Sequence, residues 1–187
     1  RWYPGSPRLI ADQLRPQDRY IGCELHPDDF RLLRANLPRQ PHIQLHERDG
    51  YEALLAFTPP PEKRGLVLID PPFELSGEFE RIAKTVAAAH ARWRSGIFAI
   101  WYPIKDKPAV WQFQEQMAAT GIRKQLLLEF IYDSPVAQGL HGSGMLVVNP
   151  PWQLAGQMAA LYARLHAALR QPVRPRMIAP VGKSGPG

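Results

Sequence analysis

The sequence has a single cysteine, Cys23, among its 187 residues. One cysteine excludes an internal disulfide framework and a cysteine-rich zinc site, and it fits a reducing compartment, so we expect a cytoplasmic protein. Apolar runs are short, and none reaches the roughly 18 residues that a membrane-spanning helix needs. No signal-peptide pattern is visible, and the six histidines show no helical metal-ligand spacing. We therefore expect neither a membrane partner nor a bound metal.

Global disorder is also excluded, because 45% of the residues are apolar and the 14 glycines and 20 prolines fall short of a low-complexity composition. The length fits one domain. We expect residues 1–170 to form it, residues 171–187, rich in proline and glycine, to be a flexible tail, and the protein to be a monomer. The formal net charge of +6 suits a polyanionic partner. The arginines are spread along the sequence, however, so a protein that is merely basic remains an alternative.

Short apolar runs alternate with stretches of helical periodicity. The runs predict strands at residues 20–25, 43–47, 66–69, 96–101, 125–132 and 144–148. The periodic stretches predict helices at residues 27–37, 51–57, 79–94, 109–120 and 154–169. This alternation favours an α/β protein with a doubly wound sheet. The last two strands have no helix between them, so we expect an antiparallel hairpin at one edge of the sheet.

Acidic residues follow the first two predicted strands, where ligands bind in such a sheet. Glu24 can accept hydrogen bonds from both ribose hydroxyls of a nucleoside cofactor. Asp49 can accept one from an adenine amine, and Gly50 lets the backbone approach the ring closely. Each feature also has a plain structural interpretation, as a solvated acid and as a common Asp-Gly turn. Taken alone, each is better explained in that plain way.

The segment Asp70-Pro71-Pro72-Phe73 follows the third predicted strand and is more specific. Its two prolines remove two backbone donors and fix the chain direction. The segment therefore presents carbonyl acceptors, a carboxylate and an aromatic ring at the end of one strand. This combination suits a planar base that carries an amino group and has been turned out of its stack. The alternative, a helix start with proline at its first position, is less well supported.

A second segment of similar pattern, Asn149-Pro150-Pro151-Trp152, follows the last predicted strand. Its place after the final strand, and not near the sheet centre, argues against a catalytic role. We expect it to be a strand-to-helix turn that helps to shape the mouth of the substrate site.

A wider set of motifs occurs in a specific order along nearly the whole chain. They are WYPGSP (2–7), CELHP (23–27), RDGY (48–51), RGLVLIDPPF (64–73), GIFAIWYP (96–103), TGIRK (120–124) and SGMLVVNPPW (143–152). Asp-Pro-Pro-Phe alone resembles the signature of amino-group methyltransferases that use S-adenosylmethionine. The ordered set resembles the bacterial 23S ribosomal RNA adenine-N(6) methyltransferases of the RlmJ type.

The resemblance implies a Rossmann-like class I methyltransferase fold and roles for particular residues. The residues implied to contact S-adenosylmethionine are Ser6, Glu24, Asp49, Gly50 and Asp70. Asp70 would be the catalytic residue, and Pro71, Pro72 and Phe73 would bind the substrate base. Phe73 stands where tyrosine is common, and either ring can stack. The implied partner is 23S ribosomal RNA.

The chain departs from the family pattern at its start. The family begins with a histidine-bearing segment and a glycine-rich loop after its first strand, and neither is present here. That strand lies at the centre of the sheet, so we expect residues that precede Arg1 to be missing from this chain. Two other functions remain open: methylation of adenine in DNA, or a non-catalytic nucleic-acid-binding module linked to the use of external DNA.

Overall fold

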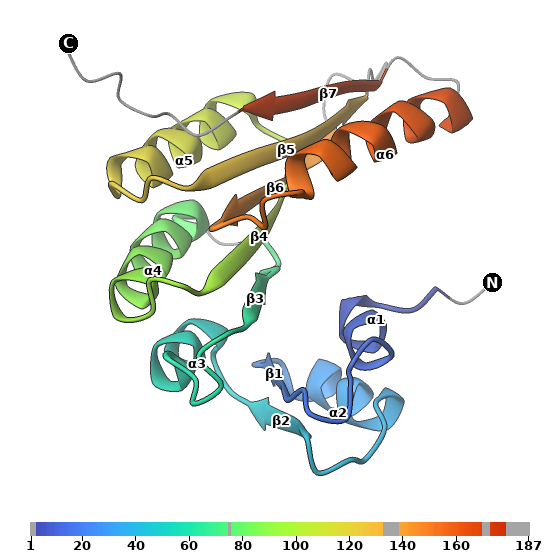
Figure 1. The fold of residues 1–187 in the computed structure, drawn as a ribbon, viewed down its shortest axis with the longest axis vertical. Helices are drawn as coiled ribbons and strands as arrows, with labels where there is room; N and C mark the ends of the chain where they lie inside the picture. Colours follow the sequence, from blue (N-terminus) through green and yellow to red (C-terminus); the bar gives the residue numbers. More distant parts are fainter. Residues whose placement is uncertain (1–2, 75, 133–138, 170–172, 179–187) are drawn as a thin grey trace. The chain divides into compact units, whose positions relative to one another are not determined.

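The chain folds into two compact units in the computed structural model, Arg1–Phe57 and Thr58–Gly187. The structure describes residues 3–74, 76–132, 139–169 and 173–178. Both units combine helices with parallel strands (Figure 1), so the predicted α/β class is confirmed.

The first unit holds a two-stranded parallel sheet and three helices. The strands β1 (Tyr20–Glu24) and β2 (Ile43–Glu47) pair in register from Tyr20 with Ile43 to Glu24 with Glu47. The helices are α1 (Ser6–Ala11), α2 (Pro27–Asn36) and α3 (Gly50–Phe57). Proline at the first helical position starts α2, because its fixed φ suits a helix and its missing N–H would be unsatisfied there anyway.

The second unit holds a five-stranded sheet in the order β3-β4-β6-β5-β7. Its strands are β3 (Leu66–Ile69), β4 (Ile97–Pro103), β5 (Gln125–Tyr132), β6 (Gly142–Val148) and β7 (Val173–Ile178). Its helices are α4 (Glu78–Arg92), α5 (Lys107–Ala119) and α6 (Leu154–Leu169). Among the described strands of this sheet, the β3–β4 pair is parallel, and the β4–β6, β5–β6 and β5–β7 pairs are antiparallel.

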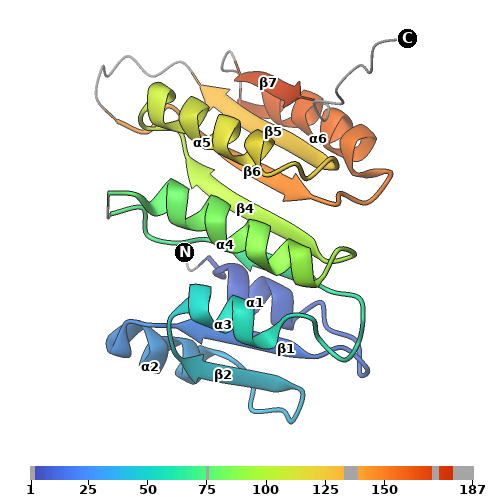
Figure 2. The same ribbon diagram turned by 90° about the vertical axis from the view of Figure 1, so that its left-hand side faces the viewer.

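Helices cover both faces of the five-stranded sheet, with α4 and α5 on one face and α6 on the other (Figures 1 and 2). Beneath α4 and α5 lie side chains that are completely buried, among them Phe98 and Ile100 of β4 and Phe113 of α5. Beneath α6 lies a separate cluster formed by Leu126, Leu128, Val147 and Tyr162. Burial of apolar surface on both faces holds this sheet in place.

A buried polar cluster lies under α5. Glu129 of β5 is only 3% exposed, and its Oε1 accepts hydrogen bonds from Tyr102 Oη at 2.9 Å and from Gln114 Nε2 at 2.7 Å. Burial, with the Glu129 charge beside it, holds the pKa of Tyr102 well above its usual value. A Cβ at Gly144 would overlap the Tyr102 ring, so the glycine makes room for this ring. Because Glu129 has two donors, its burial is tolerated.

The sequence predicted one doubly wound sheet, whereas the described strands form two sheets. Within the described part of the chain, β3 pairs only with β4, so one of its edges has no partner strand. The apolar run 66–69 predicted a strand covered on both faces, yet Leu66 is 63% exposed because β3 stands at this edge.

Two expectations about the last part of the chain are wrong. The hairpin is antiparallel as predicted, but β6 lies between β4 and β5, and β7 takes the edge. The flexible tail was expected from residue 171 onward, yet residues Val173–Ile178 form β7, which pairs with β5. An edge strand tolerates Pro175 because only one of its sides must carry ladder hydrogen bonds. The rest of the expected tail, 171–172 and 179–187, lies outside the described residues.

None of the helices described here is both long and apolar enough to cross a membrane. In the same residues, no three His, Cys, Asp or Glu side chains are grouped as metal ligands would be.

Candidate active site

The two acidic residues predicted to hold a cofactor lie at neighbouring strand ends in the first unit. The backbone N–H of Arg48 donates to the Glu24 carbonyl at 3.0 Å, so the ends of β1 and β2 stay together. Glu24 Oε1 accepts from the backbone N–H of His26 at 2.8 Å. Asp49 Oδ1 accepts from the N–H groups of Tyr51 at 2.8 Å and Glu52 at 3.3 Å. Asp49 therefore caps α3, a structural role that differs from the Asp-Gly turn offered as the alternative.

Gly50 and Ser6 were also predicted to contact the cofactor. A Cβ at Gly50 would meet no atom within 4 Å, so the space beside this backbone is open. Ser6 is exposed at the first residue of α1. Among the described residues, no hydrogen bond joins Ser6 to Glu24 or Asp49. Strand pairing thus places Glu24, Asp49 and Gly50 at neighbouring strand ends, and Ser6 lies on α1.

Asp70 follows β3 in the second unit, at the carboxyl end of the parallel β3–β4 pair. Its side chain keeps access to solvent, yet partial burial by the surrounding chain raises its pKa. Within the described residues, no donor forms a hydrogen bond to the Asp70 carboxylate. A carboxylate at a strand end without a structural hydrogen bond retains its acceptor capacity for a ligand.

Phe73 adopts a left-handed backbone conformation, with a φ of 54°. Such a φ is uncommon for a bulky residue and carries strain, which clusters at functional sites. The Phe73 ring lies 5.2 Å from the ring of Phe79 and 6.0 Å from the ring of Trp101, measured between centroids. These two rings fix the position of Phe73 at the end of the motif.

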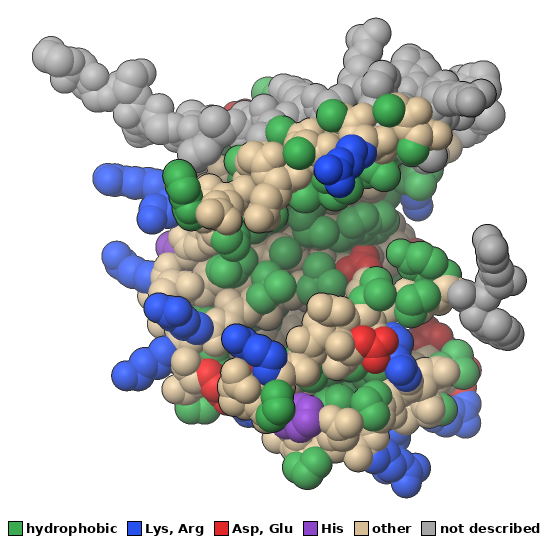
Figure 3. Space-filling model, turned by 45° about the vertical axis from the view of Figure 1, so that its right-hand side comes forward, with side chains coloured by type: hydrophobic (Ala, Val, Ile, Leu, Met, Phe, Trp, Pro, Cys, Tyr) green, Lys and Arg blue, Asp and Glu red, His purple; other side chains and the backbone are tan. Residues whose placement is uncertain are grey.

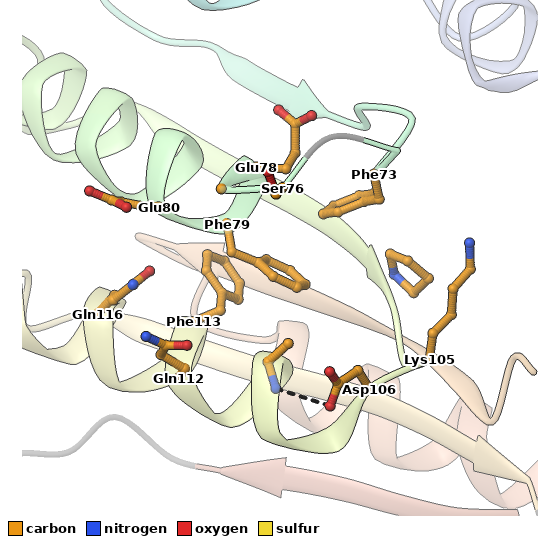
Figure 4. A pocket seen from close by; sticks show the side chains of 13 residues that line it. Phe73, Ser76, Glu78, Phe79, Glu80, Lys105, Asp106, Gln112, Phe113 and Gln116 are labelled. Carbon is orange, nitrogen blue, oxygen red and sulfur yellow. Dashed lines mark hydrogen bonds between the residues drawn. The ribbon is translucent and has the colours of Figure 1, made fainter. Parts of the chain in front are cut away.

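A cavity of about 490 Å³ opens beside Phe73, between the amino-terminal parts of α4 and α5 (Figure 4). Phe79 and Phe113 stack against each other at 4.8 Å on its apolar side. Polar side chains border it, namely Ser76, Glu78, Glu80, Lys105, Asp106, Gln112 and Gln116. Asp106 also caps α5, since its Oδ1 accepts from the backbone N–H of Ala109 at 3.3 Å. A cavity with apolar rings and several polar groups suits a planar, polar ligand.

The three residues at the end of β4, Trp101, Tyr102 and Pro103, differ in their surroundings. The structure divides them: Pro103 lines the cavity, Tyr102 is fully buried, and Trp101 contacts the Phe73 ring. Sequence reasoning missed the other lining residues. Lys105 and Asp106 carried a usable signal, because they follow the end of a strand just as Asp70 does.

The second Asn/Asp-Pro-Pro-aromatic segment does not shape this site, contrary to expectation. Strand β6 runs antiparallel to β4, so its last residue, Val148, pairs with Phe98 near the start of β4. Asn149 Nδ2 donates to the carbonyls of Arg94 and Gly96, both at 2.8 Å. The segment therefore lies at the opposite end of the sheet from Asp70, and its amide is occupied by structural hydrogen bonds.

Comparison with solved structures defines the class of fold first. The chain is similar to protein LPL1258 from Legionella pneumophila str. Philadelphia 1, with a TM-score of 0.90 and 30% identity over 96% of this chain and 67% of that chain. It is also similar to a "probable spermidine synthase" from Corynebacterium glutamicum ATCC 13032, with a TM-score of 0.61, 17% identity and coverage of 93% and 62%. The second likeness is one of fold alone.

The family is shown by the sequence itself. The chain belongs to the family described as "Ribosomal RNA large subunit methyltransferase D, RlmJ", whose model matches residues 1–177. It is 38% identical over 170 residues to "Ribosomal RNA large subunit methyltransferase J" of Escherichia coli (strain K12). The protein of the same name from Haemophilus influenzae is also 38% identical over 170 residues. The resemblance found in the ordered motifs is thereby confirmed.

The alignments with these two relatives cover 90% of this chain but only 61% and 60% of the relatives. The chain thus spans about three fifths of the length of the curated relatives it matches.

Proposed function

We propose that the complete protein is an S-adenosylmethionine-dependent methyltransferase that modifies the exocyclic amine of an adenine in 23S ribosomal RNA. The observation that carries this proposal is the Asp70–Phe73 segment. There, a carboxylate with no described donor and an aromatic ring in strained backbone follow the end of one strand, and the ring borders a cavity. The family membership supports the class of substrate.

The residues of the first unit fit a nucleoside cofactor. Carboxylates at the ends of two neighbouring parallel strands suit ribose hydroxyls and a ring amine, which are hydrogen-bond donors. We propose that Glu24 holds the ribose and Asp49 the adenine amine, with Ser6 as a further contact. The open space beside Gly50 leaves room for a ring against the backbone. S-adenosylmethionine supplies a methyl group bonded to a positively charged sulfur.

In the second unit, we propose that the target base stacks on Phe73 at the edge of the cavity. Pro71 and Pro72 have carbonyl oxygens but no N–H groups. This stretch of backbone therefore offers only hydrogen-bond acceptors, which suit the donor groups of the base. Lys105, an exposed cation among the lining residues, is suited to a phosphate of the same RNA segment.

The main contribution of this chain to the reaction would be to orient the target amine toward the methyl donor. The lone pair of an aromatic amine is spread into its ring, which makes the amine a poor nucleophile. Hydrogen bonds from the amine to Asp70 and to the Pro71 carbonyl direct the lone pair toward the methyl donor. The methylated nitrogen then becomes acidic, and Asp70 accepts its proton at that late stage.

We further propose that residues 1–170 belong to one methyltransferase domain with a doubly wound, Rossmann-like sheet. The parallel pairs in each unit support this arrangement, as does the β3 edge without a described partner. The strand order in a crystal structure of the complete protein tests this point.

The test of the function is a transfer assay with the complete protein and S-adenosylmethionine labelled in its methyl group. Protein-free 23S ribosomal RNA and duplex DNA are compared as acceptors, and the product nucleoside is identified by mass spectrometry. We expect N(6)-methyladenosine in the RNA alone, and none with Asp70→Ala. Methylation of DNA and not of RNA, or of another atom of the base, would overturn the proposal.

A further inference from the structure

Five exposed cations lie at the end of the five-stranded sheet that is opposite to Asp70. Lys63 and Arg64 precede β3, Arg94 precedes β4, and Arg123 and Lys124 precede β5. Strands β3, β4 and β5 all run in the same direction, because β4 and β5 are both antiparallel to β6. Their amino-terminal ends therefore lie on the same side of the sheet. We call these five residues the basic end.

Hydrogen bonds join the segments that carry these cations. The carbonyl of Lys63 accepts from Trp93 Nε1 at 3.1 Å and from Ser95 Oγ at 3.4 Å. Asn149 then connects the next two segments, since its side chain donates to the Arg94 carbonyl and its backbone N–H donates to the Lys124 carbonyl, both at 2.8 Å. The cations thus belong to one continuous surface, although they are up to 61 positions apart in the sequence.

The buried ring of Trp93 lies beneath two of these segments and holds them in place. A Cβ at Gly65 would lie 2.9 Å from this ring, and a Cβ at Gly96 would overlap it. Both glycines therefore allow the backbone to approach the indole closely. A surface that is fixed before binding loses less entropy when a ligand arrives.

The charge of this surface is strongly one-sided. The segments 58–65, 92–96, 120–124 and 149–153 contain six Lys or Arg residues and one acid, Glu62. Across the described part of the chain, no ion pair involves any of the five side chains of the basic end. Figure 3 shows exposed Lys and Arg side chains at the left edge of that view and at other places on the same face. A cluster of this kind attracts a polyanion.

Trp152 stands three residues after Asn149 and is 90% exposed. An indole so exposed gains little from the protein around it, whereas it offers a face on which an unpaired base can stack. Cations beside an exposed aromatic ring are the combination with which proteins bind single-stranded nucleic acid. Double-stranded RNA keeps its bases stacked inside and is recognised by its backbone and shape instead.

We propose that the basic end is a second RNA contact, which binds the backbone phosphates of an unpaired segment outside the target nucleotide while one base stacks on Trp152. Strand β4 separates this end from Trp101, the ring beside Phe73, by about 16 Å. The target nucleotide and the bound segment are therefore different parts of one RNA. This inference rests on the proposed function for the identity of the RNA.

The test compares the complete wild-type protein with the triple variant Arg64→Gln, Arg94→Gln, Lys124→Gln. The matched control removes three exposed cations that lie elsewhere: Arg34→Gln, Lys84→Gln, Arg164→Gln. Binding is measured by fluorescence anisotropy over a series of KCl concentrations. The two labelled probes are a long 23S ribosomal RNA fragment and a short one limited to the target loop. Methyl transfer to the short fragment is measured in parallel.

We expect the triple variant to bind the long fragment about tenfold more weakly or worse, with a log–log salt slope smaller by about 2. Its binding and methylation of the short fragment should equal those of the wild type, and the control should bind both fragments normally. Trp152→Ala should weaken binding of the long fragment about fivefold, and Trp152→Phe should restore it.

Two results would overturn the inference: an unchanged salt slope in the triple variant, or an equal loss in the control. An equal loss on both fragments would also overturn it, because the contact would then belong to the target site. Failure of the wild type to methylate either RNA would count against the proposed function instead, and the slope measurement remains interpretable in that case.

Discussion

Two segments of this chain share the pattern Asx-Pro-Pro-aromatic, and the structure uses them differently. Asp70-Pro71-Pro72-Phe73 ends a strand at the carboxyl side of a parallel pair, and no described donor binds its carboxylate. In Asn149-Pro150-Pro151-Trp152, the side-chain amide donates to two carbonyls at the other end of the sheet. Each segment contains one residue with a left-handed backbone, Phe73 in the first and Asn149 in the second. The comparison teaches that the same pattern can leave its polar side chain free of structural hydrogen bonds, as in the proposed site, or use that side chain to fix a turn.

The largest expected effect is that of Asp70. Asp70→Ala should lower methyl transfer by at least about 100-fold, because the target amine loses its acceptor. Transfer of a labelled methyl group to RNA measures the effect, and circular dichroism checks that the fold is intact. The comparison would break if a folded Asp70→Ala protein kept more than a tenth of the wild-type rate.

Asn149→Ala should act on stability instead. Two carbonyls lose their donor, which costs about 2 kcal/mol in the free energy of unfolding. Urea denaturation measures this loss, and the rate per folded molecule should stay at the wild-type value. Asn149→Asp is the matched control, since it keeps the shape, removes the donor and should be destabilised to a similar degree. A loss of rate at full stability would show that this segment belongs to the catalytic site.

The two aromatic residues sharpen the comparison further. Phe73→Ala should raise the KM for RNA about tenfold, as expected when a base loses a stacking partner. Phe73→Tyr should keep the wild-type value. Trp152→Ala should leave the KM for a short target fragment unchanged. Steady-state kinetics with that fragment measure all three variants, and equal effects of the two alanine variants would contradict the distinction.

The smallest effect concerns pH. Burial raises the pKa of Asp70 above the usual value of about 3.9 for aspartate, so the folded state binds this proton more tightly than the unfolded state. Ionised Asp70 therefore costs stability above its folded pKa, and this cost disappears as the pH falls through it. Asp70→Asn should accordingly unfold at an equal or slightly higher temperature at neutral pH, as calorimetry can show. A clear decrease would contradict the assignment.

The same raised pKa of Asp70 predicts where the acid limb of the activity profile lies, which a pH series of the transfer rate measures. The ionised carboxylate is the form that accepts from the amine, so the rate should fall as the pH drops through the raised pKa of Asp70. Because that pKa is raised, the limb should lie at a higher pH than an ordinary aspartate gives.

Elements whose signal is local were predicted well from the sequence. The strands at 43–47, 66–69 and 125–132 and the helix at 154–169 have the predicted bounds, because apolar runs and helical periodicity mark them directly. The strand Val173–Ile178 was missed because two arginines and a proline hide the apolar pattern of an edge strand.

The same distinction between local and long-range signals applies to the residues of the candidate site. Asp70 and Phe73 could be predicted because they belong to one four-residue motif, and their roles stay a prediction. The cavity beside Phe73 could not be found in this way, since the start of α4, the end of β4 and the start of α5 all contribute to it. The basic end could not be predicted either, because its lysines and arginines are far apart in the sequence. They come together only because β3, β4 and β5 run in the same direction and begin at the same side of the sheet.

Strand β3 has only four residues, and the residues that flank its two ends have different surroundings. Gly65, just before the strand, is held against the Trp93 indole, and Asp70 follows directly after it. An extended backbone is stiff along its length, so these two positions are joined by a rigid rod of about 16 Å. Because β3 is also paired with β4 along all four of its residues, it has no freedom to slide along its own axis. The indole and the carboxylate therefore keep a constant separation, and packing at one end of the strand sets the position of the other.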